Sequence, residues 1–268
     1  MPVTSPIALR PCTQKEFTAI DYRVMQDAFE CQNELGRLCD ELIYQTDLAA
    51  RLEGADLGPV RTRVPVLVTH CDFSKTYYLD LVVRDSAIYE LKVAAQLVAD
   101  HEAQLLNYLF LGGVSHGKLL NFRPPQVQSR FVNTTLTVEA RHKMAIDTSR
   151  WKEDGEASRS LRLKFLELVD DWGGFLELPL YAEALTHFLG GEVQVLKSIP
   201  LTRNGVALGN QRFHLLAPDA GFRITALAET DADNHEHHLR ALLRHSPLST
   251  IQWLNIFQHH IQLVTLTK

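Results

Sequence analysis

The stretch "DSAIYELKVAAQLVADHEAQLLNYL", residues 85–109, predicts a short apolar strand followed by a helix. Side chains alternate between the two faces of a strand, so Glu90 and Lys92 share one face while Tyr89 and Leu91 share the other. One face of this strand is therefore apolar, and the other carries a carboxylate beside an ammonium group.

Further polar side chains are expected to gather around that strand. Asp80 interrupts the apolar run "YYLDLVV", which a tight "RDS" turn joins to the Glu90 strand, and Glu41 projects from an earlier helix. Gln104 and Tyr108 are four residues apart and share one face of the following helix. Two or three carboxylates can hold a divalent cation that activates water and polarises a phosphoryl group. The set favours metal-dependent chemistry over the simpler interpretation, a surface salt bridge at a sheet edge.

The surrounding sequence predicts an ordered series of elements. Thr13 and Glu16 form a capping-box pattern at the start of the first helix, and apolar positions at helical spacing continue as far as Gly36. A second helix, three β-rich runs, a third helix and a fourth strand follow at residues 39–54, 62–70, 76–83, 87–93, 98–113 and 116–122.

Asp80, the hairpin, "ELK" at 90–92 and "HEAQLLNYL" at 101–109 resemble the core of the PD-(D/E)XK nuclease superfamily, and specifically its small GxxExxY family. The stretch "NELGRLCDELIY" matches the start of that family, whose Gly-x-x-Glu-x-x-Tyr falls on Leu38, Glu41 and Tyr44. Leucine replaces the glycine of this motif. The resemblance covers about residues 14–125 and implies a restriction-endonuclease-like αβββαβ core with a magnesium-dependent phosphodiesterase site.

The resemblance also implies roles for individual residues. It assigns Mg²⁺ or Mn²⁺ to Glu41, Asp80 and Glu90. It makes Lys92 the catalytic lysine, acting with Glu90, Asp80 and Gln104. It places Gln104, Tyr108 and Tyr44 at the substrate.

Composition sets bounds on this interpretation. The chain has 268 residues and a net charge of −5 without a long basic run, which counts against nonspecific nucleic-acid binding but leaves room for a local basic groove. No stretch approaches the roughly 18 apolar residues of a membrane span, and the N-terminus lacks a signal-like segment. Four cysteines without CxxC spacing favour a cytoplasmic location. His235, His238 and His245 lack a zinc-site pattern and indicate an exposed polar helix.

The second half of the chain resembles the first when the sequence is shifted by 134 residues. "DHEAQLLNYL" at 100–109 then faces "NHEHHLRALL" at 234–243, and "KLLNF" at 118–122 faces "QWLNI" at 252–256. We therefore predict an α/β tandem pair of αβββαβ domains, 1–135 and 136–268, the second degenerate. In this alignment the second domain has lost the polar set, with His214, Ile224, Ala226, His238 and Leu242 opposite Asp80, Glu90, Lys92, Gln104 and Tyr108.

These observations predict a metal-dependent nuclease that hydrolyses DNA or RNA. Its C-terminal pseudo-nuclease half would serve packing, substrate binding or assembly, including formation of a homo-oligomer. The alternative is a non-catalytic protein that uses a nuclease-like fold to bind nucleic acid or to self-assemble.

Overall fold

The computed structural model describes residues 2–55 and 57–268, and the chain divides into two compact units. The N-terminal unit comprises residues 2–69 and 74–138, and the C-terminal unit comprises residues 70–73 and 139–268. Each unit is built on one six-stranded sheet that mixes parallel and antiparallel pairs. None of the helices in the described part of the chain is long and apolar enough to span a bilayer.

The N-terminal unit contains the series of elements that the sequence predicts, with one additional strand at each end. These elements are β1 (Val3–Thr4), α1 (Gln14–Leu35), α2 (Glu41–Gly54), β2 (Val60–His70), β3 (Phe73–Val83), β4 (Ala87–Lys92), α3 (Ala99–Gly112), β5 (His116–Asn121) and β6 (Gln128–Asn133). The sheet order is β1-β2-β3-β4-β5-β6, and β4 and β5 run parallel. The predicted helices and four strands are confirmed, whereas β1 and β6 were not predicted.

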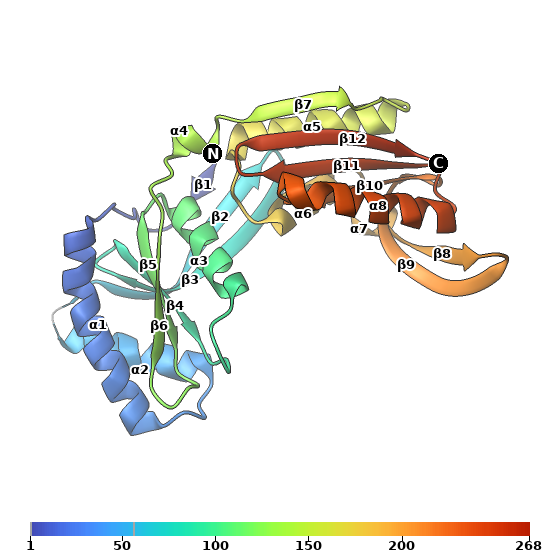
Figure 1. Cartoon of the computed structure of the whole chain (residues 1–268). Coiled ribbons are helices and arrows are strands. Elements are labelled where there is room, and N and C mark those ends of the chain that lie inside the picture. Colours follow the sequence, from blue (N-terminus) through green and yellow to red (C-terminus); the bar gives the residue numbers. More distant parts are fainter. Residues whose placement is uncertain (1, 56) are drawn as a thin grey trace. The chain divides into compact units, whose positions relative to one another are not determined.

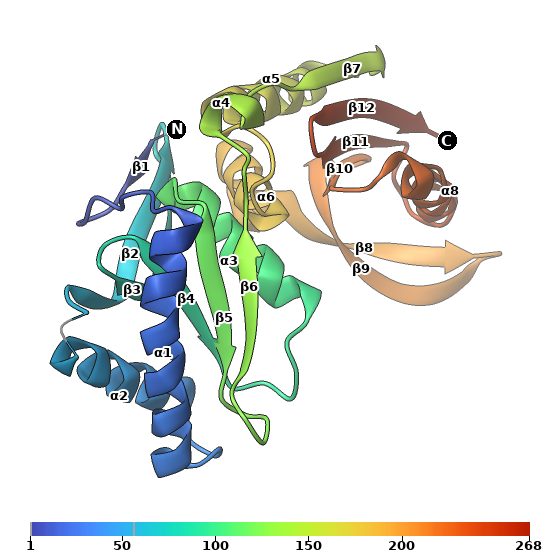
Figure 2. The ribbon, with the colours of Figure 1, turned by 60° about the vertical axis from the view of Figure 1, so that its left-hand side comes forward.

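Helices cover both faces of this sheet. α1 begins at the predicted capping box, in which the Thr13 hydroxyl accepts from the Glu16 amide and the Glu16 carboxylate accepts from the Thr13 amide. Apolar side chains of α1 and α2 pack with Tyr89 and Leu91 of β4 in one buried cluster. α3 packs against β5 and β6 (Figures 1 and 2). The face of β4 opposite Tyr89, which carries Glu90, is therefore the α3 side of the sheet.

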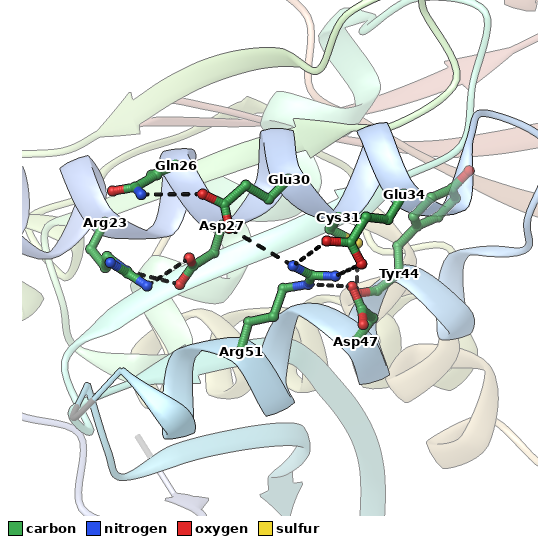
Figure 3. Close-up of polar contacts among 9 residues, drawn as sticks. All are labelled: Arg23, Gln26, Asp27, Glu30, Cys31, Glu34, Tyr44, Asp47 and Arg51. Atoms are coloured by element: carbon green, nitrogen blue, oxygen red, sulfur yellow. Dashed lines mark hydrogen bonds and ion pairs between the residues drawn. The ribbon is translucent and has the colours of Figure 1, made fainter.

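A polar network fixes α2 against α1 (Figure 3). The Arg51 guanidinium of α2 lies 2.6 Å from an Asp47 carboxylate oxygen and 2.7 Å from an oxygen of Glu34, which belongs to α1. Arg23 and the buried Asp27 form a second pair within α1, at 3.1 Å. Because one guanidinium binds carboxylates from both helices, the rotation of α2 about its axis is restrained. This restraint determines which side chains of α2 face the sheet.

The C-terminal unit has its own helices and strands in a closely similar order. These elements are α4 (Val138–Arg141), β7 (Ala145–Arg150), α5 (Glu156–Trp172), α6 (Leu178–Phe188), α7 (Glu192–Val195), β8 (Leu196–Arg203), β9 (Val206–Ala217), β10 (Ala220–Thr225), α8 (Glu229–His245), β11 (Thr250–Phe257) and β12 (His260–Thr267). The sheet order is β7-β12-β11-β10-β9-β8, and β10 and β11 run parallel. Trp172 and Trp253 are buried in this unit.

The two units share one topology. In each, a pair of helices precedes three strands, a helix and two further strands, with the short α7 added after the pair in the C-terminal unit. The strand neighbours are the same in β2-β3-β4-β5-β6 as in β8-β9-β10-β11-β12. The parallel pair also occurs at the same place, β4–β5 and β10–β11. The first strand differs, since β1 pairs with β2 at one edge while β7 pairs with β12 at the other.

The predicted gapless shift of 134 residues is wrong in the central strands. The Asn121 amide bonds both backbone groups of Ala94, accepting from its N–H at 3.0 Å and donating to its C=O at 2.8 Å. Asn255 makes the same two bonds to Leu227, at 2.8 and 2.9 Å. The asparagines are 134 residues apart, but their backbone partners are 133 apart. The chain after β10 is therefore one residue longer than the chain after β4.

This register changes which residues correspond. The last paired residues are Leu81 with Tyr89 in β3–β4 and His214 with Phe222 in β9–β10. The next positions are Asp80 with Glu90 in one unit and Phe213 with Arg223 in the other, while Thr225 takes the place of Lys92. The predicted equivalence of His214, Ile224 and Ala226 with the acidic and lysine positions is thus wrong. The positions of Glu90 and Lys92 are occupied by the polar residues Arg223 and Thr225 and not by Ile224 and Ala226.

The helical pairs correspond through a tyrosine and a glycine. The Tyr44 hydroxyl donates to the Gly36 carbonyl at 2.7 Å, and the Tyr181 hydroxyl donates to the Gly173 carbonyl at 2.5 Å. Each glycine ends the preceding helix, with φ of 75° and 76°, a backbone region that favours glycine. By this correspondence Leu178 occupies the place of Glu41.

Candidate active site

Asp80 and Glu90 meet where β3 and β4 cease to pair. The Leu91 amide, which would otherwise bond across the ladder, donates to Asp80 Oδ2 at 2.9 Å. Glu90 lies next to that amide, and its side chain is 2% exposed. The apolar sequence of β4 explains this burial, because a strand covered by helices on both faces hides any polar residue in its middle.

Lys92 extends along the same face of β4, as the alternation of side chains predicts. Its Nζ lies 2.6 Å from Glu90 Oε1, and its side chain is 14% exposed. The other carboxylate oxygen, Glu90 Oε2, is buried without a hydrogen-bond partner. A buried carboxylate oxygen without a partner is costly and calls for a cation or a proton.

The charges of this site act on one another. The pKa of Glu90 is raised to about 8, chiefly by burial and also by the Asp80 charge, while the Lys92 ammonium opposes both effects. Burial also raises the pKa of Glu41, while the Lys92 charge lowers it and the Asp80 charge raises it. Glu41 is therefore within electrostatic reach of the pair formed by Asp80 and Glu90.

The donor set fits a divalent cation in part. Asp80 and Glu90 are paired carboxylates, and the unpartnered Glu90 Oε2 is an oxygen that a hard cation would satisfy. Among the described residues, no group of three or more Asp, Glu, His or Cys side chains is placed to hold one metal ion. The structure thus brings two of the three predicted metal ligands together, and the predicted third, Glu41, lies near them without completing a set.

Gln104 and Tyr108 lie on one face of α3, as predicted from their spacing. Gln104 Nε2 donates to the Tyr108 hydroxyl at 2.9 Å. The Tyr108 ring packs edge-on against Tyr77 of β3, with ring centroids 6.1 Å apart. Gln104 is half-buried, so its amide oxygen is available on the α3 side of the sheet, the side that Glu90 faces.

Tyr44 has a different place from the predicted one. Its side chain is fully buried, its ring stacks on Phe122 with centroids 4.5 Å apart, and its hydroxyl is bonded to Gly36. A fully buried ring cannot contact a substrate. Tyr44 therefore holds the α1–α2 turn together, and this packing role replaces the predicted substrate contact.

Two residues that position the site were not predicted to belong to it. Gln45 is buried and donates from Nε2 to the Asp80 carbonyl at 2.5 Å, which ties α2 to β3 at one of the predicted metal ligands. Asn121 is the neighbour of Lys92 across the β4–β5 pair and secures the chain just beyond it. The signals were in the sequence: Gln45 is four residues after Glu41 and so on the same helix face, and Asn121 recurs as Asn255.

Comparison with known proteins agrees with this geometry. Residues 18–133 match the family model described as PD-(D/E)XK nuclease superfamily, so they form a domain of that superfamily. A solved structure titled "Crystal structure of SSO0001" is similar at 18% identity and a TM-score of 0.27, over 42% of this chain and 66% of that chain. The chain therefore spans just under two thirds of that structure's length, and a similarity of this size carries no argument. No curated protein matches the chain.

Proposed function

We propose that the N-terminal unit is a divalent-metal-dependent nuclease of the GxxExxY type, and that the C-terminal unit is a degenerate, non-catalytic copy of it. The observation that carries this proposal is Glu90, a buried carboxylate with a raised pKa beside Asp80 and with one oxygen unpartnered. A protein that needed only a stable strand would place an apolar residue there. Ionisable groups kept in such positions are characteristic of active sites.

Asp80 and Glu90 would hold Mg²⁺ or Mn²⁺, together with Glu41. When bound, the cation supplies a Lewis acid for the phosphoryl oxygen and lowers the pKa of a bound water. Gln45 holds the backbone of Asp80, and the Leu91 amide holds its carboxylate, so that the remaining Asp80 oxygen is oriented. The protein thereby arranges the ligands before the metal arrives.

Lys92 would supply the positive charge next to the scissile phosphate. Its ammonium contacts Glu90 at 2.6 Å. From this place Nζ would orient the attacking water or stabilise the charge that develops on the phosphoryl oxygens. Gln104 and Tyr108 would border the substrate from α3.

The degenerate-copy proposal is supported by features that the two units share and by those they do not. The helix-ending glycine with its tyrosine, the strand order and the backbone-bonding asparagine occur in both units. The four chemical positions are replaced in the C-terminal unit, where Leu178, Phe213, Arg223 and Thr225 stand in place of Glu41, Asp80, Glu90 and Lys92. Each chain would then have one catalytic site.

The test is cleavage by the full chain of end-labelled single- and double-stranded DNA and RNA, titrated with Mn²⁺ and Mg²⁺. We expect metal-dependent cleavage that Asp80→Ala abolishes, together with loss of calorimetrically detected metal binding and an unchanged circular dichroism spectrum. Asp85→Asn is the matched control, because it removes a surface carboxylate at the β3–β4 turn where asparagine tolerates the φ of 50°. Absence of both cleavage and metal binding in the wild type would favour the non-catalytic alternative.

A further inference from the structure

The side of the C-terminal sheet that α8 covers carries two cations, Arg223 at the position equivalent to Glu90 and Lys197 on the neighbouring part of the sheet. In the β8–β9 register Lys197 pairs with Phe213, and in the β10–β11 register Arg223 pairs with Trp253. Phe213 and Trp253 belong to the core cluster that includes Leu239 of α8. Because paired residues share a face, Lys197 and Arg223 lie on the α8 side as well.

Lys197 and Arg223 are both exposed, and over residues 2–55 and 57–268 neither forms an ion pair with a carboxylate. The acidic residues nearby have other partners: Glu236 of α8 binds Arg150 and Arg240 at 2.8 Å each, and Glu192 binds Arg212 on the opposite face of β9. Asp231 and Asp233 are exposed in the first half of α8, before the positive region begins.

Two histidines of α8 border this positive region. The His235 ring lies 5.5 Å from the Trp253 ring, and its Nε2 is buried without a hydrogen-bond partner. Burial lowers the pKa of His235, and the charges of Arg223 and His238 lower it further, so the imidazole lies in a positive field. His238 is exposed one helical turn later. An unsatisfied ring nitrogen and unpaired cations on one side of a sheet are suited to an anionic ligand.

We propose that Lys197, Arg223, His235 and His238 form a surface that binds the phosphodiester backbone of a nucleic acid, here called the α8-side surface. The proposal rests on the proposed function, because that function supplies the class of ligand. The substitution of Asp80 and Glu90 by Phe213 and Arg223 would then convert a metal site, which repels phosphate until a cation binds, into a surface that attracts phosphate directly.

Lys197 and Arg223 lie on strands two apart, so their Cα atoms are about 10 Å from each other at about 4.8 Å per strand. A nucleic-acid strand that crosses this surface can place phosphates at both cations, and the proposed function supplies that class of ligand. The binding is expected to depend on salt, since each phosphate contact releases a counterion.

The test is fluorescence anisotropy of the full chain with a labelled single-stranded 20-mer, DNA or RNA, in EDTA and low salt. We expect the double variant K197E/R223E to bind at least tenfold more weakly and to show a shallower dependence of log affinity on log salt, by about 1 to 2. The matched control is Arg212→Glu, an exposed arginine of the same sheet on the opposite face, which should bind within twofold of wild type. Affinity within twofold of wild type for K197E/R223E would overturn the proposal.

Two further measurements separate this proposal from the nuclease proposal. The α8-side surface predicts that Asp80→Ala retains oligonucleotide binding in EDTA, and that K197E/R223E with an intact circular dichroism spectrum retains metal binding at Asp80 and Glu90. NMR of the imidazole resonances should show His235 shifting and its pKa rising on addition of the 20-mer, with no change on equimolar inorganic phosphate. An equal response to inorganic phosphate would identify a site for small anions and contradict the proposal.

Discussion

The sheets of the two units have nearly the same strand arrangement, but they carry different side chains at the positions of the proposed site. Each has the same strand neighbours, a parallel pair at the same place and an asparagine that bonds both backbone groups of a residue beyond the central strand. At the position next to the last antiparallel pair, however, one sheet holds Asp80 and Glu90 and the other holds Phe213 and Arg223. The comparison separates residues that build the fold from residues that the fold does not require.

The cost of each arrangement supports that separation. Glu90 is almost completely buried, and its ionised form is disfavoured by burial and by Asp80. Arg223 at the matching place is exposed, where a charge costs little. The same topology forms with the exposed Arg223 at this position. The buried, destabilising Glu90 carboxylate is therefore not needed for folding and has another role.

The largest expected effect distinguishes the role of Lys92 from that of Thr225, which takes its place in the C-terminal unit. Lys92→Ala should lower the rate of cleavage by about 10³-fold, in the range of removing one charge-stabilising or proton-transferring group, and should leave the melting temperature in Mg²⁺ nearly unchanged. Thr225→Ala should do the reverse, because the Thr225 hydroxyl donates to Asn255 and accepts from the Trp253 indole in the core. Activity and thermal melts of both variants check this. Intact cleavage in Lys92→Ala with a large loss of stability would make Lys92 a structural residue.

The next prediction concerns the pH dependence of the metal-free protein. The pKa of Glu90 is raised from 4.5 to about 8 in the folded chain, so between these values the folded state retains a proton that the unfolded state releases. Its contribution to stability is thus present below about pH 4.5 and is lost as pH rises toward 8, by about 1.4 kcal/mol for each pH unit in that window.

Urea unfolding at several pH values in EDTA, compared with Glu90→Gln, measures this contribution. Glu90→Gln removes the titrating group, so its stability relative to wild type should increase from pH 5 to pH 8. Arg223→Gln, at the matching place, should run parallel to wild type. A constant difference between Glu90→Gln and wild type over this range would show that the buried carboxylate is not protonated.

Sequence patterns predicted the frame of the N-terminal unit and the local part of its site. The strand alternation placed Glu90 and Lys92 on one face, and the helix spacing brought Gln104 to Tyr108, because both relations depend only on the period of one element. The role of Tyr44 depends on tertiary packing against Phe122, which no local period reveals. The correspondence of Asn121 with Asn255 was visible in the sequence. The extra residue that follows β10 lies in a loop, and an alignment without gaps could not reveal it.

A smaller effect, of equal size in both units, is expected for the two asparagines. Asn121→Ala and Asn255→Ala each remove two hydrogen bonds to a half-buried backbone N–H and C=O, which should lower the free energy of unfolding by about 2 kcal/mol. Only Asn121→Ala should also weaken metal binding, since it loosens the chain next to Lys92. Urea unfolding and calorimetric titration with Mn²⁺ distinguish the two losses. A large loss for one asparagine and none for the other would indicate that they are not equivalent.

The smallest expected effect tests the helical pairs. Tyr44→Phe and Tyr181→Phe each remove one hydroxyl that donates to the carbonyl of a helix-ending glycine, at 2.7 and 2.5 Å, and leave the ring packing in place. Each substitution should lower the free energy of unfolding by about 1 kcal/mol, the net value of one such hydrogen bond. Neither should change the affinity for an oligonucleotide, because both rings are fully buried. Urea unfolding and anisotropy of the two variants provide the measurement. If Tyr44→Phe weakened oligonucleotide binding with unchanged stability, Tyr44 would regain the substrate role that its burial argues against, and its correspondence with Tyr181 would not extend to function.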